Sequence, residues 1–529
     1  MEIFRKMRFN TVFLIFFYLL VFALLWQHSF SYLDPDLGWH LKVGEEMASS
    51  QAVPSQNHYN YTYTGDWVDH EWLSNLLSYQ VFDSFSYSGL SLMFSLLIVL
   101  VLVILTLVTR KILPKIPIFI IAFLQLFGLI ASLPHFGVRL QEINLLFLLL
   151  LLTTLYFYNK QRKWAYLILL LPLFYLWTNL HGGFLLGLGI LFAFGIAKAI
   201  EKVPCINRWK AIDVSQELKR VEVIRVFIFF LLSLATTFFT PYYLELYSFL
   251  SEYSNTFYLS HIQEWLSQFY FPFKYWQLLY LALAFAFFLH HLYKVFLEKK
   301  HKLNIWDSFL FVFFFVLSFQ SRRHFPLFFV SSFVLIARLM LDFFSVEGGK
   351  KSFFNFGHKL FIIVCFAMVI PGIIINTNYT NKPFESFCDY YPCGAVEFLK
   401  NNPQYDDLNI FNQYAWGGFL IWEYPEKTLF IDGRLPQKEF AEHTFLEEYL
   451  DFFKEDAEVD ELLSEYNVEL ILIEAKSREK KVRKWERVLF RITDDELERD
   501  NYFRDHIAAS DDWREVYNDG MAVVFVKNE

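Results

Sequence analysis

The stretch SGLSLMFSLLIVLVLVILTLVT, residues 88–109, decides the fold because it contains no Asp, Glu, Lys or Arg. A helix of about 20 such residues crosses the hydrocarbon core of a bilayer, and its backbone groups bond only to one another there. Residues 11–31, 116–133 and 143–159 are equally free of these charges. The 529-residue chain is 55% hydrophobic and contains 64 Phe, more apolar material than soluble domains carry. The sequence therefore predicts a polytopic α-helical membrane protein.

The apolar stretches predict about eleven transmembrane helices. The first follows Arg5, Lys6 and Arg8, but it is too long for a signal peptide and has no small-residue cleavage site, so we expect a membrane anchor. The expected spans are 11–31, 88–109, 116–133, 143–159, 164–179, 182–198, 226–241, 275–292, 305–321, 325–344 and 359–376.

The basic residues of the connecting loops orient these spans, because cytoplasmic loops carry an excess of Lys and Arg. With the N-terminus in the cytoplasm, the inner loops hold clusters such as Arg110, Lys111 and Lys115, whereas the outer loops hold few bases. An odd number of spans then places residues 377–529 outside the cytoplasm. We expect an integral protein of the cell membrane with a cytoplasmic N-terminus and an extracytoplasmic C-terminal domain.

The sequence divides into a transmembrane domain, residues 1–376, and a soluble tail, residues 377–529. The tail alternates short apolar runs with helical patterns, which favours an α/β layer domain. Its strands are expected at Leu408–Phe411, Thr428–Ile431, Val468–Ile473 and Met521–Val526, and its helices at Gln437–Phe453 and Glu458–Tyr466. Cys388 and Cys393 either form a local disulfide or remain two thiols, and Asp432 with Arg434 is compatible with a turn salt bridge. The net charge is −8 and no basic stripe suits nucleic acid, so that class of partner is excluded.

The first outer loop, residues 32–87, carries the most informative residues. Asp34 and Asp36 flank a proline at the membrane exit of the first span. Such a pair can bind a divalent metal such as Mg or Mn, or one member can act as general base. The plainer alternative is that Asp36 caps the following helix, 37–48, which would leave Asp34 unexplained. That helix and the amphipathic stretch 70–85 are expected to lie in the membrane interface.

The other outer loops are short and rich in polar groups. Arg322, Arg323 and His324 run against the positive-inside tendency, and they suit a phosphate or pyrophosphate headgroup because Arg binds its oxygens bidentately; simple anchoring to anionic lipid is the alternative. Further candidates for one substrate cavity are Arg139, His40, His70, Glu71, His135, Glu142, Asn179, His181 and Glu264. Ionisable groups at membrane depth are costly and tend to mark function.

Several motifs together resemble a known superfamily. They are Asp34-Pro35-Asp36 with Trp39-His40, then His70-Glu71-Trp72-Leu73, Asn179-Leu180-His181-Gly182-Gly183, Arg322-Arg323-His324-Phe325-Pro326, Tyr414-Ala415-Trp416-Gly417-Gly418 and Asp432-Gly433-Arg434. Their order resembles bacterial and archaeal membrane proteins of the glycosyltransferase C superfamily, relatives of protein mannosyltransferases, lipid A aminoarabinose transferases and oligosaccharyltransferases. The resemblance covers nearly the whole chain.

The resemblance implies a reaction. Members take a sugar from a polyprenyl phosphate or pyrophosphate and transfer it at the outer membrane face. Asp34 and Asp36 match the family's catalytic acid, which serves as base or helps to hold a metal, and Arg322, Arg323 and Arg139 match its phosphate-binding residues. The sugar and the acceptor stay open. The rival hypotheses are a transporter or flippase for a lipid-linked sugar, which usually shows repeated halves, and a non-catalytic membrane scaffold.

Overall fold

The computed structural model describes residues 2–31, 33–253, 256–270, 272–346, 387–440 except 389, 443–476 except 456, 485, 487 and 501–528. The chain forms two compact units, which are considered separately. The helical unit consists of Met1–Tyr32, Ser91–Tyr243 and Gln263–Thr380. The mixed unit consists of Leu33–Leu90, Leu244–Ile262 and Asn381–Glu529. The first outer loop therefore belongs to the same unit as the tail, which the sequence did not indicate.

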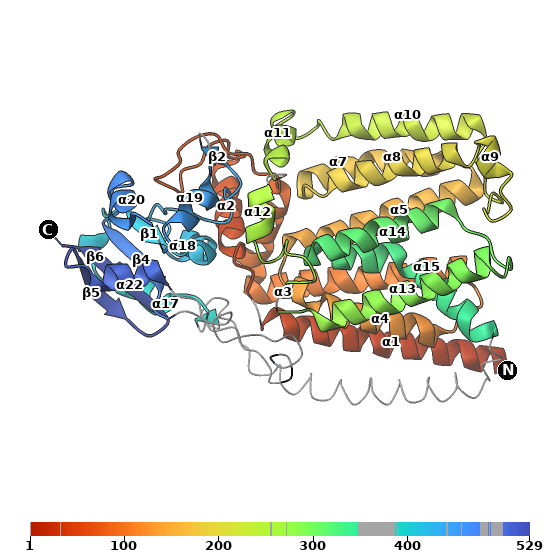
Figure 1. Ribbon diagram of the computed structural model, residues 1–529, viewed down its shortest axis with the longest axis horizontal. Helices are drawn as coiled ribbons and strands as arrows, with labels where there is room; N and C mark the ends of the chain where they lie inside the picture. Colours follow the sequence, from red (N-terminus) through yellow and green to blue (C-terminus); the bar gives the residue numbers. More distant parts are fainter. Residues whose placement is uncertain are drawn as a thin grey trace. The chain divides into compact units, whose positions relative to one another are not determined.

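The helical unit is a bundle whose long helices run alongside one another (Figure 1). Neighbours in contact include α14 with α15, α10 with α8, and α13 with α4. The helices are α1 (Glu2–Ser29), the second part of α3 (Trp72–Ile112), α4 (Ile118–Ser132), α5 (Ile143–Gln161), α6 (Ala165–Ile168), α7 (Leu170–Leu180), α8 (Phe184–Ile200), α9 (Pro204–Asn207), α10 (Arg220–Thr236), α13 (Tyr275–Phe296), α14 (Ile305–Gln320) and α15 (Phe325–Val346).

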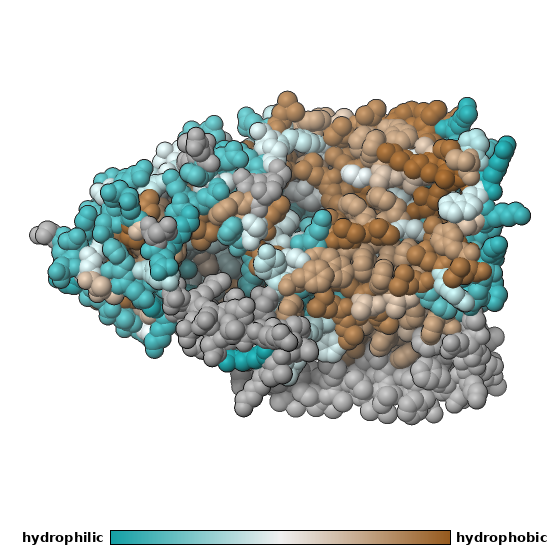
Figure 2. Space-filling model, in the orientation of Figure 1, coloured by the Kyte–Doolittle hydropathy of each residue, from teal (hydrophilic) through white to brown (hydrophobic). Residues whose placement is uncertain are grey.

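The surface of the bundle is apolar, as a lipid-facing surface must be. Leu96, Leu107, Leu231 and Trp276 are among its large exposed hydrophobic side chains. Figure 2 shows hydrophobic colour over most of this unit and hydrophilic colour over most of the unit that carries the sheet. Exposed apolar area on this scale would be unfavourable in water, so the chain is an integral membrane protein.

Six helices are long and apolar enough to cross a membrane by length and composition. They are Asn10–Ser29, Trp72–Ile112, Ile118–His135, Leu140–Gln161, Tyr275–Phe296 and Arg322–Phe343. Three further apolar helices are shorter: Ala165–Leu180, Phe184–Ile200 and Ile305–Gln320. A helix of about 16 residues rises only about 24 Å, which is less than the hydrocarbon thickness of about 30 Å. The expected total of eleven spans is therefore not confirmed, and the expected span 359–376 lies outside the described residues.

Helix α3 consists of two helices joined at Ser86, whose φ of 55° and ψ of −164° are not helical. The amphipathic stretch predicted to end near Phe85 therefore ends there, and the predicted span begins directly afterwards. In the first part, Ser74, Asn75 and Ser78 are buried whereas Leu77 and Phe85 are exposed. Exposed Leu77 and Phe85 are the kind of side chains that an interfacial helix turns to the lipid, while Gln80 and Asp83 are exposed on the same helix.

The mixed unit contains a four-stranded sheet with the order β1-β4-β6-β5. Strand β1 (Ile410–Asn412) is parallel to β4 (Leu470–Glu474), whereas β4, β6 (Ala522–Lys527) and β5 (Trp513–Asn518) are antiparallel neighbours. Phe411 faces Ile471, which in turn faces Phe525. The predicted strands around β1, β4 and β6 are confirmed, but the run Thr428–Ile431 makes only isolated bridges through Leu429.

Helices cover this sheet and bury its apolar residues. The ring of Phe411 lies within 5.4 Å of the rings of Tyr449, Phe452 and Phe503. The helices of the unit are α2 (Leu37–Ser50), the first part of α3, α11 (Glu245–Glu252), α12 (Thr256–His261), α17 (Cys393–Lys400), α18 (Gly417–Glu423), α19 (Phe445–Asp451), α20 (Val459–Glu465) and α22 (Tyr502–Ala509). The predicted helix 437–453 is wrong in its first part, because β2 (Glu439–Phe440) and β3 (His443–Thr444) form a two-stranded sheet there and helix α19 begins only at Phe445.

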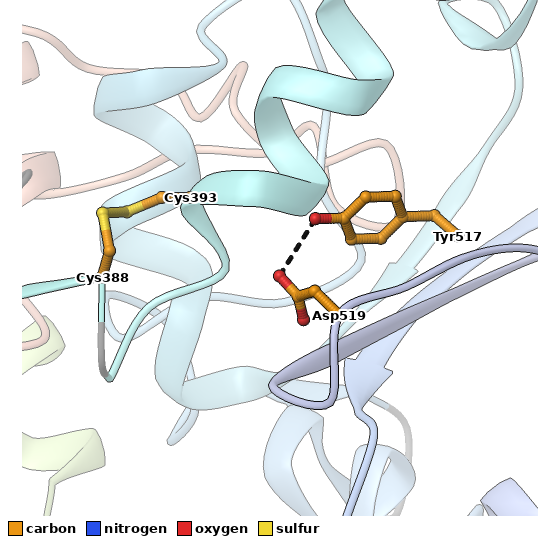
Figure 3. Close-up of a disulfide and its surroundings, with 4 residues drawn as sticks. All are labelled: Cys388, Cys393, Tyr517 and Asp519. Atoms are coloured by element: carbon orange, nitrogen blue, oxygen red, sulfur yellow. Dashed lines mark hydrogen bonds between the residues drawn. A yellow bond between two sulfur atoms is a disulfide. The ribbon is translucent and has the colours of Figure 1, made fainter.

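Cys388 forms a disulfide with Cys393, the first residue of α17 (Figure 3). In the same view Tyr517 of β5 donates a hydrogen bond to Asp519 over 3.0 Å. A disulfide persists in an oxidising compartment. Of the two alternatives that the sequence left open, the disulfide is the one present. Cys205 is a free, exposed thiol.

Candidate functional site

Within the helical unit, three of the loops predicted to lie outside the cytoplasm meet through Arg139, Glu264 and Arg323. Arg139 donates to Glu264 over 2.5 Å, and Arg323 lies 3.7 Å from the second carboxylate oxygen of Glu264. Arg323 also donates to Gln141 and stacks over Trp265, 5.0 Å from the ring centre. Two guanidinium groups therefore converge on one carboxylate.

The two nearby guanidinium groups lower the pKa of Glu264. Burial by itself would raise it, but Arg139, Arg323 and His135 outweigh burial and hold the pKa of Glu264 at about 2. A carboxylate with so low a pKa stays charged at neutral pH. The two guanidinium groups therefore stabilise the charged form of this carboxylate.

Arg322 and Arg323 differ although they are adjacent. Arg322 is buried and donates to the backbone carbonyls of Ser267 and Tyr270, so it fastens the loop that carries Glu264. The side chain of Arg323 is about one-quarter exposed and contacts other side chains rather than backbone carbonyls. The sequence pattern gave no means to tell the two apart.

The remaining outer-loop candidates of this unit have separate surroundings. His135 is buried, and neither of its ring nitrogens has a hydrogen-bond partner among the described residues. The ring of His324 meets the ring of Trp265 edge-on, with centroids 5.5 Å apart. Glu142 accepts from the backbone N–H of Gly137 over 2.8 Å, where φ of 157° favours glycine.

The tip between α7 and α8 is held by side chains of its own. Asn179 donates to the carbonyls of Tyr175 and Phe239. His181 accepts from the N–H of Gly183 and also bonds Asn144, both over 3.0 Å. Asn179 and His181 therefore order this turn.

The mixed unit contains the acidic pair. The side chain of Asp34 accepts from the backbone N–H of Asp36 over 3.0 Å. Asp36 precedes α2 but makes no side-chain cap hydrogen bond to it. Instead its Oδ1 accepts from the indole of Trp39 over 3.0 Å. Asp36 therefore occupies the N-cap position of α2, as the alternative expected, but its side chain makes no cap hydrogen bond.

A second polar cluster of this unit surrounds His40. Its Nδ1 lies 2.7 Å from Asn75 and its Nε2 lies 3.7 Å from Glu71, which also lies 3.4 Å from His70. Burial lowers the pKa of His40 in spite of the carboxylate of Glu71, so we expect a neutral imidazole at pH 7.

Asp69 belongs to the same cluster. It accepts from Asn75 over 2.8 Å and from the N–H of Glu71 over 3.1 Å, and burial raises its pKa to about 6. Sequence reasoning had singled out His40, His70 and Glu71 but missed Asp69 and Asn75. The only feature of the sequence that could have pointed to Asp69 and Asn75 is that both lie close to His70 and Glu71 along the chain.

The metal question depends on Asp34 and Asp36. In the parts of the chain that the structure covers, no group of three or more His, Cys, Asp or Glu side chains is placed to hold a metal ion. Mg²⁺ is commonly held by only one or two carboxylates together with substrate phosphate and water. Asp34 and Asp36 could therefore hold a metal ion only if a substrate and water supplied its remaining ligands.

These features define an integral membrane protein whose fold is that of oligosaccharyltransferases of known structure, so the resemblance seen in the motifs is confirmed for the fold. The fold is similar to that of the oligosaccharyltransferase of Archaeoglobus fulgidus in its apo form. The TM-score is 0.56 with 11% sequence identity, over 88% of this chain and 69% of that chain.

The archaeal oligosaccharyltransferase AglB of the same organism, solved in complex with an inhibitory peptide and a dolichol-phosphate, is similar to the same degree. Its TM-score is 0.56 at 11% identity, over 89% of this chain and 70% of that one. No family model matches the sequence. No curated protein matches it either.

Proposed function

We propose that this protein is a membrane glycosyltransferase that moves a sugar from a polyprenyl-phosphate-linked donor to an acceptor on the extracytoplasmic side. The convergence of Arg139 and Arg323 on the carboxylate of Glu264 is the observation that carries the proposal. A phosphate presents the same anionic oxygens to guanidinium groups as a carboxylate does. The similar AglB structure contains a dolichol-phosphate, which supports a lipid-linked donor.

We assign the donor phosphate to Arg323 and Arg139, with Arg322 in a supporting role. Arg322 is largely taken up by the carbonyls of Ser267 and Tyr270, whereas Arg323 faces side chains. A preorganised pair of guanidinium groups stabilises the charge that develops on the phosphate as the sugar leaves. We assign supporting roles to the other candidates: His135, Glu142, Asn179, His181 and His324 would order the loops around the donor phosphate, and His40, His70 and Glu71 would support the acidic pair.

The chemistry is a single displacement. Asp34 or Asp36 takes the proton of an acceptor hydroxyl or amide, whose oxygen or nitrogen then forms a bond to the anomeric carbon. The bond from that carbon to the phosphate oxygen breaks, and its electron pair stays on the lipid phosphate. Inversion follows from one displacement, and no second carboxylic acid is needed, unlike in glycoside hydrolysis. Mg²⁺ or Mn²⁺ held by the acidic pair would supply further charge neutralisation.

The disulfide and the loop charges support an outer location for the mixed unit. Cys388 and Cys393 are paired, and the positive-inside pattern places the tail outside. The acceptor and the sugar stay open, although the inhibitory peptide bound by AglB makes a polypeptide the first acceptor to test.

Transfer assays on aspartate variants test the proposal. Membranes with the full-length protein would receive a labelled polyprenyl-phosphate sugar, with Asp34→Asn, Asp36→Asn and, as the matched control, Asp83→Asn, which changes an exposed acid of the same loop. Loss of the general base should reduce transfer by about 10²–10⁴-fold. Full transfer by both Asp34→Asn and Asp36→Asn would refute the base assignment.

A further inference from the structure

Two motifs of the tail have no part in the mechanism so far, Gly417-Gly418 and Asp432-Gly433-Arg434. Within the mixed unit both lie against the segment that carries the acidic pair. A side-chain carbon at Gly38 would overlap the carbonyl of Gly418, and one at Gly418 would overlap the carbonyl of Pro35. The backbones of α2 and α18 therefore touch directly, and only glycine permits so close an approach.

Gly433 lies directly against the carboxylate of Asp36. A methyl group at Gly433 would overlap Oδ1 of Asp36, while Oδ2 would be 3.6 Å away. Gly433 is not among the residues with positive φ, so its backbone conformation is open to other residues. What demands glycine there is the space that Asp36 occupies.

The residues on either side of Gly433 form a buried ion pair. Both side chains are fully buried, and Arg434 donates to the two carboxylate oxygens of Asp432 over 2.9 and 2.7 Å. Arg434 also donates to Asn57 and Asn60 of the first outer loop over 2.9 and 3.0 Å. A buried ion pair held by this many hydrogen bonds tolerates little displacement, although Nη1 of Arg434 has no hydrogen-bond partner among the described residues.

A chain of side-chain contacts also connects the guanidinium of Arg434 to Asp36. It stacks over Trp67, 4.8 Å from the ring centre. Trp67 meets Trp39 edge-on at 6.3 Å, and the indole of Trp39 donates to Oδ1 of Asp36. Oδ1 is therefore fixed between the indole donor and the backbone of Gly433.

We infer that Gly433 and Arg434 are positioning residues for Asp36, so that the C-terminal segment completes the acidic site. This inference rests on the proposed function, because it assumes that Asp36 takes part in sugar transfer. The contacts themselves can be tested without any assay of transfer.

The first experiment measures coupling between the two positions by thermal unfolding of the full-length protein in detergent. Gly433→Ala should lower the unfolding midpoint by about 2–4 °C, because the methyl group displaces the Asp36 carboxylate. In an Asp36→Ala background the same change should have little effect, because the carboxylate is gone. Gly189→Ala is the matched control, since a side chain there meets open space. An equal loss in both backgrounds would overturn the inference.

The second experiment separates positioning from stability. Gly433→Ala and Arg434→Lys should lower kcat for sugar transfer at least about 10-fold and leave KM for the donor within about 2-fold. Lysine keeps the charge of Arg434 but loses its planar fork and stacking. Coupling to Asp36 with unchanged kcat would refute the role in transfer. If the wild-type protein transfers no sugar, the proposed function fails while the coupling experiment still decides the contact.

Discussion

Glu264 offers the most quantitative prediction, because its environment shifts its ionisation strongly. Its carboxylate faces Arg139 and Arg323, and its pKa falls from 4.5 to about 2. A group whose pKa is lower in the folded protein stabilises the fold above its unfolded pKa, and this contribution is lost as the pH falls through the folded pKa. We therefore expect Glu264→Gln to cost stability at pH 7 and progressively less below pH 4.5.

The size of the effect follows from the two pKa values. The change from 4.5 to about 2 corresponds to about 3 kcal/mol at neutral pH. Glu264 is about one-third exposed, so solvent screening should reduce the measured value to about 1–3 kcal/mol. More than half of this contribution should be gone at pH 3.

The assay is thermal or denaturant unfolding of the wild-type protein and Glu264→Gln in detergent between pH 7 and pH 3. Glu245→Gln, which changes an exposed acid on α11, is the matched control and should show a small difference at every pH. A stability difference for Glu264→Gln that stays constant across this range would refute the ion-pair reasoning.

Two further predictions concern the disulfide and the interfacial helix. Cys393→Ser should destabilise the mixed unit by about 2 kcal/mol, because the bond closes only a short loop, and alkylation with and without reductant should detect the pair in the wild-type protein; equal alkylation under both conditions would contradict it. Phe85→Cys, labelled with an environment-sensitive fluorophore in a Cys205→Ser, Cys365→Ser background, should report an apolar environment in vesicles, whereas Asp83→Cys should report water. Matching spectra at the two sites would contradict the interfacial placement.

The sequence predicted those features that depend on local pattern. The apolar run 88–109 gives a membrane helix because its length and composition suffice, and the break near Phe85 coincides with the change from an amphipathic to a uniformly apolar pattern. Strand β5 was missed because its exposed face is polar, as the sequence Trp513–Asn518 shows. The turn salt bridge of Asp432 and Arg434 was foreseen because its partners are two residues apart.

Pairings between distant segments could not be read from the sequence. Arg434 bonds Asn57 and Asn60 across more than 370 residues, and no local pattern connects these positions. The contact of Gly433 with Asp36 is of the same kind. Likewise, the convergence of Arg139 on Glu264 depends on how α4, α5 and α13 pack, and only the residue types can be read from the sequence.

Donor binding tests the central claim, that the outer-loop arginines hold a lipid phosphate. The dissociation constant of a short polyprenyl phosphate would be measured by calorimetry in detergent for the wild-type protein and Arg323→Gln. Arg110→Gln, which changes an exposed arginine of a predicted cytoplasmic loop, is the control. A charge-assisted hydrogen bond is worth about 1.5–3 kcal/mol, so Arg323→Gln should weaken binding about 10–100-fold and Arg110→Gln should not. Equal affinity for all three proteins would contradict the account.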